Sequence, residues 1–230
     1  MHASRISADI LEASRRRRRA EHIFLDLDPR RTAHLVVDLQ NGFMREGAPA
    51  LVPNAALIVP NVNRISKAIR AAGGHNVFLR FTCDETEIRN WSVVDAYLTK
   101  ERRDVFRQAF ARESHDWQLS DALDRTDDDL VLEKTRYSAF IQGTCSLHDV
   151  LTARGVDTII ISGTMSNCCC ESTARDGMQM NYRVIFVEDA NAALTDELHN
   201  ATLNNMAALF ADVMPAELVV RQLAACAARP

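Results

Sequence analysis

Three kinds of side chain that together could activate a thiol stand at the ends of apolar runs in this sequence. Asp38 ends one run, Lys134 ends a second, and the consecutive cysteines Cys168–Cys170 follow a third. A thiolate is the nucleophilic form of cysteine, and a nearby ammonium group or a helix start lowers its pKa. A carboxylate can accept the thiol proton, and backbone N–H groups at a helix start can hold an oxyanion. Each residue alone has an ordinary structural role, but together they favour covalent catalysis at a carbonyl carbon.

These side chains would meet if the runs that carry them were neighbouring strands of one sheet. From residue 32 onward, apolar runs alternate with segments of helical periodicity, which is typical of βαβ units. The predicted strands are residues 33–38, 77–81, 129–133, 158–162, 183–187 and 212–214. The predicted helices are residues 54–72, 146–154, 168–180, 195–210 and the segment from residue 215 onward. We expect an α/β fold with a mostly parallel six-stranded sheet, helices on both faces, and a site at the carboxyl ends of the strands.

Length and composition fit one globular domain with a short arm before it. The chain has 230 residues, of which 47% are hydrophobic and 25% charged, enough for a single core. We expect an arm over residues 1–31 and a catalytic domain over residues 32–230. The run Arg15–Arg19 could bind nucleic acid, but the net charge of −4 favours a helical arm packed on the domain or on a neighbouring subunit. Apolar runs are too short for a membrane span and no signal peptide is recognisable, so we expect a cytoplasmic protein without a nucleic-acid or membrane partner.

The cysteine and histidine spacing does not predict a metal site. The six cysteines stand at positions 83, 145, 168, 169, 170 and 226, with no pair at the spacing of zinc ligands. The seven histidines are scattered singly. Three consecutive cysteines and the expected cytoplasmic location favour reduced thiols over disulfides. We therefore expect no metal and no other cofactor.

Four blocks of the sequence resemble the isochorismatase-like cysteine hydrolases, in the order and spacing of that family. They are VVDLQNGF (36–43), LEKTRYSAF (132–140), SGTMSNCCCESTARDG (162–177) and RVIFVEDA (183–190). The resemblance covers roughly residues 32–214 and implies a Rossmann-like three-layer α/β sandwich. Its motifs look most like the branch that hydrolyses ureidoacrylate and carbamoyl amides. Similar enzymes are usually dimers or tetramers, so the resemblance implies a homo-oligomer.

The resemblance also implies a role for individual residues. Asp38, Lys134 and Cys169 stand where the family has its catalytic aspartate, lysine and nucleophile. Helix geometry agrees that one of three consecutive cysteines faces a given point, because successive side chains turn by about 100°. Similar enzymes have a cis peptide bond at the position of Thr164–Met165. That bond would aim the backbone N–H of Met165 beside that of Cys169, as an oxyanion hole.

Two departures from other branches narrow the expected chemistry. The nicotinamidase branch binds a metal through an Asp-x-His motif after the second strand, whereas residues 82–86 read TCDET here. The missing histidine implies that there is no metal and that nicotinamide is not the substrate. The true isochorismatases lack the cysteine, so Cys169 argues against vinyl-ether cleavage.

Several residues beside the catalytic blocks are candidates for substrate contacts. Phe43, Tyr137 and Phe140 could form apolar walls, or could equally pack in the core. Gln40 and Asn167 could bind a polar group of the substrate, or could hold the backbone of loops.

The sequence thus predicts a hydrolase that cleaves the carbonyl C–N bond of a small amide, ureido or carbamoyl metabolite through a thioester. Its partners would be that small molecule and water. One alternative is the opening of a cyclic amide by the same thiol chemistry, which releases no ammonia. Another is a non-catalytic binding protein that keeps this fold.

Overall fold

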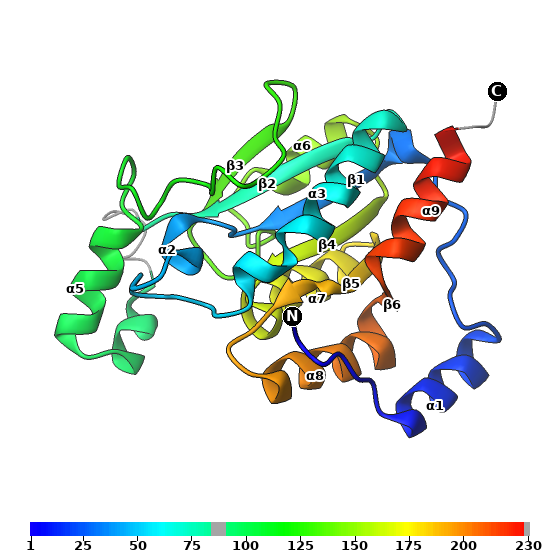
Figure 1. The fold of residues 1–230 in the computed structure, drawn as a ribbon, viewed down its shortest axis with the longest axis horizontal. Coiled ribbons are helices and arrows are strands. Elements are labelled where there is room, and N and C mark those ends of the chain that lie inside the picture. The colour runs from blue at the N-terminus through cyan, green and yellow to red at the C-terminus, as the bar shows by residue number, and fades with distance from the viewer. Residues whose placement is uncertain (84–90, 228–230) are drawn as a thin grey trace.

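Six parallel strands form one sheet in the computed structural model, which describes residues 1–83 and 91–227 (Figure 1). They are β1 Thr32–Val37, β2 His75–Phe81, β3 Leu130–Lys134, β4 Thr158–Thr164, β5 Arg183–Ala192 and β6 Asp212–Met214. The strand order is β3-β2-β1-β4-β5-β6, and every neighbouring pair is parallel. The predicted fold class is confirmed, and each predicted strand is present.

Helices cover both faces of the sheet. The α-helices are α1 Ala8–Arg18, α2 Asn41–Met44, α3 Ala55–Ala71, α5 Lys100–Ala109, α6 Leu147–Ala153, α7 Glu171–Gln179, α8 Asp196–Asn205 and α9 Ala216–Ala227. Short 3₁₀ segments are η1 Pro29–Arg31 and η2 Ser92–Tyr97, and π-helical turns are η3 Ser166–Cys170 and η4 Met206–Phe210. The predicted helix over residues 168–180 therefore starts as a π-helical turn and continues as α7.

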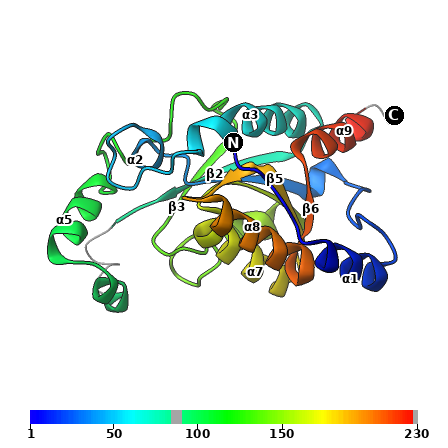
Figure 2. The same ribbon diagram turned by 60° about the horizontal axis from the view of Figure 1, so that its bottom comes forward.

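The core has two layers, one on each side of the sheet. One layer packs α3 and α9 against residues such as Val36 and Ile160. The other packs α6, α7 and α8 against residues such as Leu35 and Ile161. Figure 2 shows α3 and α9 on one side of the sheet and α7 and α8 on the other. Every residue of β1 and β4 is buried, and both strands carry apolar side chains on both faces of the sheet.

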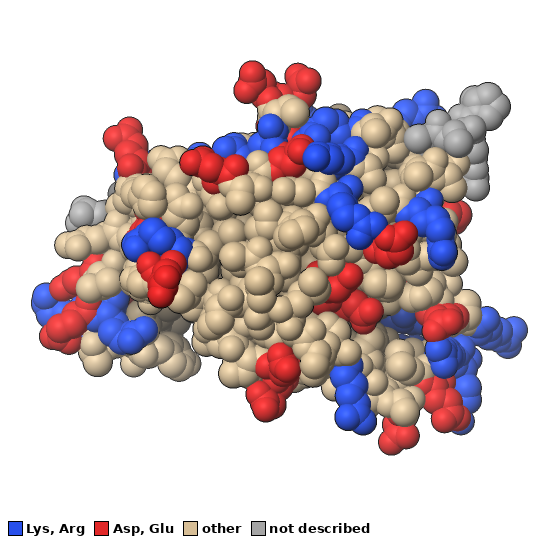
Figure 3. Space-filling model, in the orientation of Figure 1, with Lys and Arg blue, Asp and Glu red and all other residues tan. Residues whose placement is uncertain are grey.

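The N-terminal arm lies along the helical layer that contains α8. In this arm, Ser14 Oγ donates a hydrogen bond of 2.8 Å to the carbonyl of Ala207 in η4. Arg18 donates to the carbonyls of Ala207 and Ala211, each at 2.9 Å. Figure 3 shows basic and acidic side chains interspersed on one face of the molecule, around a largely uncharged centre. Within residues 1–83 and 91–227, no helix combines the length and apolarity needed to cross a membrane.

Helix α5 and the short segment η2 project beyond the sheet on the side away from α9 (Figure 1). Thr99 precedes α5, and its side chain accepts a hydrogen bond from the backbone N–H of Arg102. Such a cap stabilises the first turn of a helix. The insert between β2 and β3 thus carries a defined helix beside the carboxyl ends of the strands.

Candidate active site

Asp38 and Lys134 meet at the carboxyl edge of the sheet. Asp38 directly follows β1, and Lys134 is the last residue of β3, with β2 between these two strands. Lys134 Nζ lies 2.7 Å from Asp38 Oδ2, and both side chains are fully buried. Asp38 has a φ of 51°, a left-handed conformation that is uncommon outside glycine and often occurs at functional sites. The strand end thus turns the carboxylate toward the lysine.

The end of β4 brings the cysteines to the same edge. At Gly163 the φ is +122°, and a Cβ atom there would lie 2.1 Å from the carbonyl oxygen of Val37 in β1. Only glycine allows this close approach of the two strands. The next peptide bond, Thr164–Met165, is cis. The π-helical turn η3 follows, and the carbonyl of Met165 accepts hydrogen bonds from the N–H groups of Cys168 and Cys170, at 3.0 and 3.2 Å.

The three cysteines of η3 have different surroundings. Cys169 is buried, lines a cavity, and interacts with both Asp38 and Lys134. Cys170 is fully buried in the core layer beside α7. Cys168 lines the same cavity as Cys169, so it lies closer to the site than a purely packing residue would. The wider π-helical turn accounts for this, since it rotates successive side chains by less than an α-helix does.

Burial and charge set the resting protonation of the site. Burial raises the pKa of the Asp38 carboxyl, although the Lys134 ammonium acts in the opposite direction. Burial acts to lower the pKa of Lys134, but its contacts with the Asp38 carboxylate and the Cys169 sulfur outweigh burial, so the pKa of Lys134 lies above its ordinary value. The contact with Cys168 and burial raise the pKa of the Cys169 thiol well above its ordinary value. The raised pKa favours the neutral thiol form of Cys169, beside the buried Asp38–Lys134 pair.

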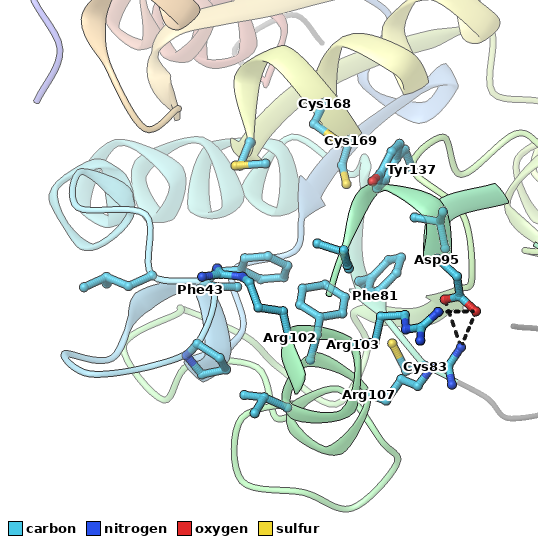
Figure 4. Close-up of a pocket in the computed structure, with 18 of the residues that line it drawn as sticks. Phe43, Phe81, Cys83, Asp95, Arg102, Arg103, Arg107, Tyr137, Cys168 and Cys169 are labelled. Atoms are coloured by element: carbon cyan, nitrogen blue, oxygen red, sulfur yellow. Dashed lines mark hydrogen bonds and ion pairs between the residues drawn. The ribbon is translucent and has the colours of Figure 1, made fainter. Parts of the chain in front are cut away.

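A cavity of about 580 Å³ opens in front of Cys169 (Figure 4). Phe43 and Tyr137, two of the sequence candidates for substrate contacts, line it. One wall comes from the insert, and its residues include Val94, Asp95, Leu98, Arg102, Arg103, Val105, Phe106 and Arg107. Sequence reasoning missed this wall because it belongs to no strand end. The mixture of Val105 and Phe106 with arginines in one short helix was the available signal.

Gln40, another candidate, holds the backbone and does not line the cavity. Its side chain is fully buried and donates hydrogen bonds to the carbonyls of Phe81, at 3.0 Å, and Trp117, at 2.8 Å. It also accepts a hydrogen bond of 2.8 Å from the N–H of Phe81. Gln40 therefore ties the end of β1 to the end of β2 and to the insert, and its amide is already occupied.

The remaining two candidates also lie away from the cavity lining. Phe140 is buried in the core and stacks on Tyr182, with ring centroids 5.3 Å apart. Asn167 is half-buried in η3, beside the cysteines but outside the lining, and its Oδ1 has no hydrogen-bond partner within the described ranges. Aromatic residues after a strand serve packing and binding alike, so their sequence position could not separate Phe140 from Phe43.

The segment in which the nicotinamidase branch has its metal-binding motif lies only partly within the described residues. Of the TCDET segment at 82–86, the described residues are Thr82 and Cys83. Within residues 1–83 and 91–227, no cluster of three or more histidine, cysteine, aspartate or glutamate side chains could hold an ion.

Comparison with known proteins shows the family of this chain. Residues 32–217 match the family model described as the isochorismatase domain. This chain belongs to the isochorismatase family. It is 32% identical over 200 residues to the ureidoacrylate amidohydrolase RutB of Pseudomonas savastanoi pv. phaseolicola, with 81% of each chain covered. This membership confirms the family predicted from the four sequence blocks.

Solved structures of isochorismatase-like proteins share this fold. A cysteine hydrolase from Pseudomonas syringae pv. phaseolicola superimposes with a TM-score of 0.77 at 31% identity, over 89% of this chain and 98% of that one. The N-carbamoylsarcosine amidase of Thermoplasma acidophilum gives a TM-score of 0.64 at 28% identity, over 81% and 97% of the two chains. As expected from the sequence, this family member is a hydrolase of C–N bonds other than peptide bonds.

Proposed function

We propose that Cys169 attacks the carbonyl carbon of a small amide, ureido or carbamoyl compound and forms a thioester. The observation that carries this proposal is the fully buried Asp38–Lys134 pair, with 2.7 Å between Nζ and Oδ2. Both residues contact the thiol of Cys169, which lines the cavity. A buried carboxylate with a raised pKa is suited to accept a thiol proton and to return it later.

The reaction begins when Asp38 takes the proton of Cys169 and the thiolate adds to the carbonyl carbon. Lys134 stabilises the developing negative charge, and the N–H groups of Met165 and Cys169 hold the oxyanion. Asp38 then gives the proton to the leaving nitrogen, the C–N bond breaks, and ammonia or an amine departs. Water, deprotonated by Asp38, hydrolyses the thioester, which releases the acid and restores the thiol.

The family match begins at residue 32, which supports a hydrolase domain over residues 32–230 and a separate arm over residues 1–31. Relatives named for ureidoacrylate and N-carbamoylsarcosine support a ureido or carbamoyl substrate. Both of those molecules carry a carboxylate. Arg102 lines the cavity, is exposed, and has no carboxylate partner among the described residues, so it is a candidate to bind such a group.

The test is a hydrolysis assay with ureido acids, carbamoyl amino acids, simple carboxamides and cyclic amides. Ammonia release and substrate loss are both followed, and each active compound is repeated with Cys169→Ala. Ammonia release that requires Cys169 is the expected result. Substrate loss without ammonia would instead show opening of a cyclic amide. No turnover, together with a Cys169 that does not react with a thiol reagent, would favour the non-catalytic binding protein.

A further inference from the structure

The cavity in front of Cys169 has the size and the walls of a site for an apolar group. Its volume of about 580 Å³ lies within the range of sites that enclose ligands of drug size. Apolar residues from several elements line it, among them Phe43, Leu51, Phe81, Val94, Leu98 and Phe106. An amide or ureide of only a few heavy atoms would leave most of this surface in contact with water.

Aromatic rings packed behind the cavity lining hold the cavity in a defined shape. The ring centroid of Phe110, which is fully buried, lies 4.6 Å from that of Phe43 and 4.7 Å from that of Phe106. The ring centroid of Phe81 lies 5.7 Å from that of Phe106. These rings come from β2, α2 and the end of α5, so residues on three segments are locked together. An apolar ligand can therefore enter without first ordering its binding site.

Three charged residues of the wall, Asp95, Arg103 and Arg107, are paired with one another. Asp95 accepts hydrogen bonds of 2.9 Å from Arg107 and lies 3.7 Å from Arg103 (Figure 4). These two guanidinium groups share one carboxylate, which offsets part of their charge. Among the described residues, Arg102 stays free to bind a carboxylate at one end of a ligand, while the apolar residues of the cavity, such as Phe43 and Phe106, favour an uncharged group elsewhere on it.

We propose that the substrate carries a bulky apolar group, either an aromatic ring or an alkyl chain of several carbons, next to the amide, ureido or carbamoyl carbonyl. The inference rests on the proposed function, because that function places the carbonyl at Cys169 and the rest of the substrate in the cavity. Each methylene group that the cavity buries should increase binding about fourfold.

Thiol labelling tests this proposal without requiring turnover. The probes are chloroacetamide and its N-butyl, N-hexyl and N-benzyl derivatives; the Cys169 thiolate displaces chloride and forms a C–S bond. The second-order rate constant at Cys169, located by peptide mass spectrometry, should rise severalfold from each probe to the next larger alkyl probe. Primary amides from acetamide to octanamide should show the same order in kcat/KM.

Neighbouring valines provide a matched pair of variants. Val94 lines the cavity, whereas Val93 is 61% exposed and lies outside the lining. Val94→Asp should reduce the preference for the hexyl probe at least tenfold, and Val93→Asp should leave it unchanged. Rate constants at Cys169 that do not depend on chain length would overturn the proposal. Hydrolysis that persists in Cys169→Ala would instead contradict the proposed function.

A different set of contacts joins the N-terminal arm to the turn that carries Cys169. His199 of α8 is buried, with Nδ1 2.8 Å from the hydroxyl of Ser166 and Nε2 3.2 Å from the hydroxyl of Ser4. Ser166 is the first residue of η3, three residues before Cys169. One imidazole ring thus connects the arm with the nucleophile turn.

The acceptors around the His199 ring favour one set of hydrogen-bond directions. The Ser4 hydroxyl donates to the carbonyl of Glu188, at 3.3 Å, so its oxygen is left to accept the Nε2–H of His199. Nδ1 then carries no proton and accepts the hydrogen bond of Ser166. Burial lowers the pKa of His199 to about 4, which keeps this neutral form at ordinary pH.

His2 of the arm holds the His199 ring from one side. The two rings stack with centroids 4.5 Å apart and planes inclined by 13°. His2 Nε2 accepts a hydrogen bond of 2.9 Å from the N–H of Ala193, and its Nδ1 lies 2.7 Å from the carboxylate of Asp196. The arm therefore contacts both the face of the His199 ring and its Nε2 atom.

We infer that Ser4 and His2 are positioning residues, which act through His199 and Ser166 to hold the turn with Cys169. The family match starts at residue 32, so this support comes from a segment outside the matched region. Loss of one hydrogen bond in the connection should reduce kcat between twofold and tenfold. KM should stay unchanged, because neither Ser4 nor His2 lines the cavity.

Substitutions of two serines in the arm test this inference. Ser4→Ala removes the acceptor of His199 and should lower kcat and the rate of Cys169 labelling by chloroacetamide to the same extent. Ser4→Thr keeps the hydroxyl and should restore both. Ser7→Ala is the control, because the Ser7 side chain makes no cap hydrogen bond. Unchanged kcat in Ser4→Ala, an equal loss in Ser7→Ala, or a change in KM alone would overturn the inference.

Discussion

Lys134 Nζ lies 2.7 Å from Oδ2 of Asp38, and neither side chain has any exposed surface. Removal of one partner would leave the other as an uncompensated charge in the protein interior, which destabilises a fold by about 3–5 kcal/mol. We expect Lys134→Ala to lower the free energy of unfolding by about this amount and to abolish turnover. Urea unfolding and hydrolysis assays measure the two effects.

Lys100→Ala is the control, because it breaks the exposed pair of Lys100 with Asp104 and should change the free energy of unfolding by less than about 1 kcal/mol. An equal decrease in the free energy of unfolding in Lys134→Ala and Lys100→Ala would contradict the prediction.

The three consecutive cysteines should respond differently to substitution by alanine. Cys169→Ala should abolish turnover, because it removes the proposed nucleophile. Cys168→Ala should keep activity within several-fold, and Cys170→Ala should keep activity while lowering the free energy of unfolding by about 1 kcal/mol, since Cys170 is fully buried in the core. Values of kcat/KM and intact-mass detection of an acylated enzyme check these outcomes. Comparable loss of activity in all three variants would exclude a single nucleophile.

The stability of the protein should fall on acidification because two buried histidines are held neutral. Burial lowers the pKa of His34 and of His199 from the ordinary value of 6.5 to about 4. Between pH 6.5 and 4 the unfolded chain binds more protons than the folded one, so the free energy of unfolding decreases as pH falls. Each histidine contributes up to about 1.4 kcal/mol per pH unit in this window.

Urea unfolding at pH 7, 6 and 5 measures this slope. His34→Leu should reduce the slope, because it removes one of the two buried histidines whose pKa is lowered to about 4. A slope that is the same in the wild-type protein and in His34→Leu would show that His34 does not take up a proton on unfolding.

Gly163 should not tolerate a side chain. A Cβ atom at this position would lie 2.1 Å from the carbonyl oxygen of Val37, and the φ of +122° is unsuited to alanine. We expect Gly163→Ala to lower the free energy of unfolding by more than about 3 kcal/mol and to remove activity, because β4 must move away from β1. Gly143→Ala is the matched control: its φ is also positive, at +75°, but a Cβ atom meets nothing within 4 Å, so about 1 kcal/mol is expected. Thermal and urea unfolding of both variants decide the prediction.

The sequence by itself determined the parallel sheet and the residues that meet at its carboxyl edge. Buried parallel strands are continuous apolar runs, and they must end at one edge, so Asp38, Lys134 and the cysteines could be placed together without coordinates. The family blocks then singled out Cys169 among its neighbours. Apolar runs, strand ends and motifs can be recognised from the order of residues alone.

Only the tertiary structure decided which side chains face the cavity. Gln40 and Phe140 stand in the same sequence blocks as Asp38 and Lys134, yet Gln40 ties backbone segments together and Phe140 packs on Tyr182. The cavity wall on α5 and the contact of Ser4 with His199 join segments far apart in the chain. No periodicity or motif records such contacts, because they depend on how loops and helix ends pack in three dimensions.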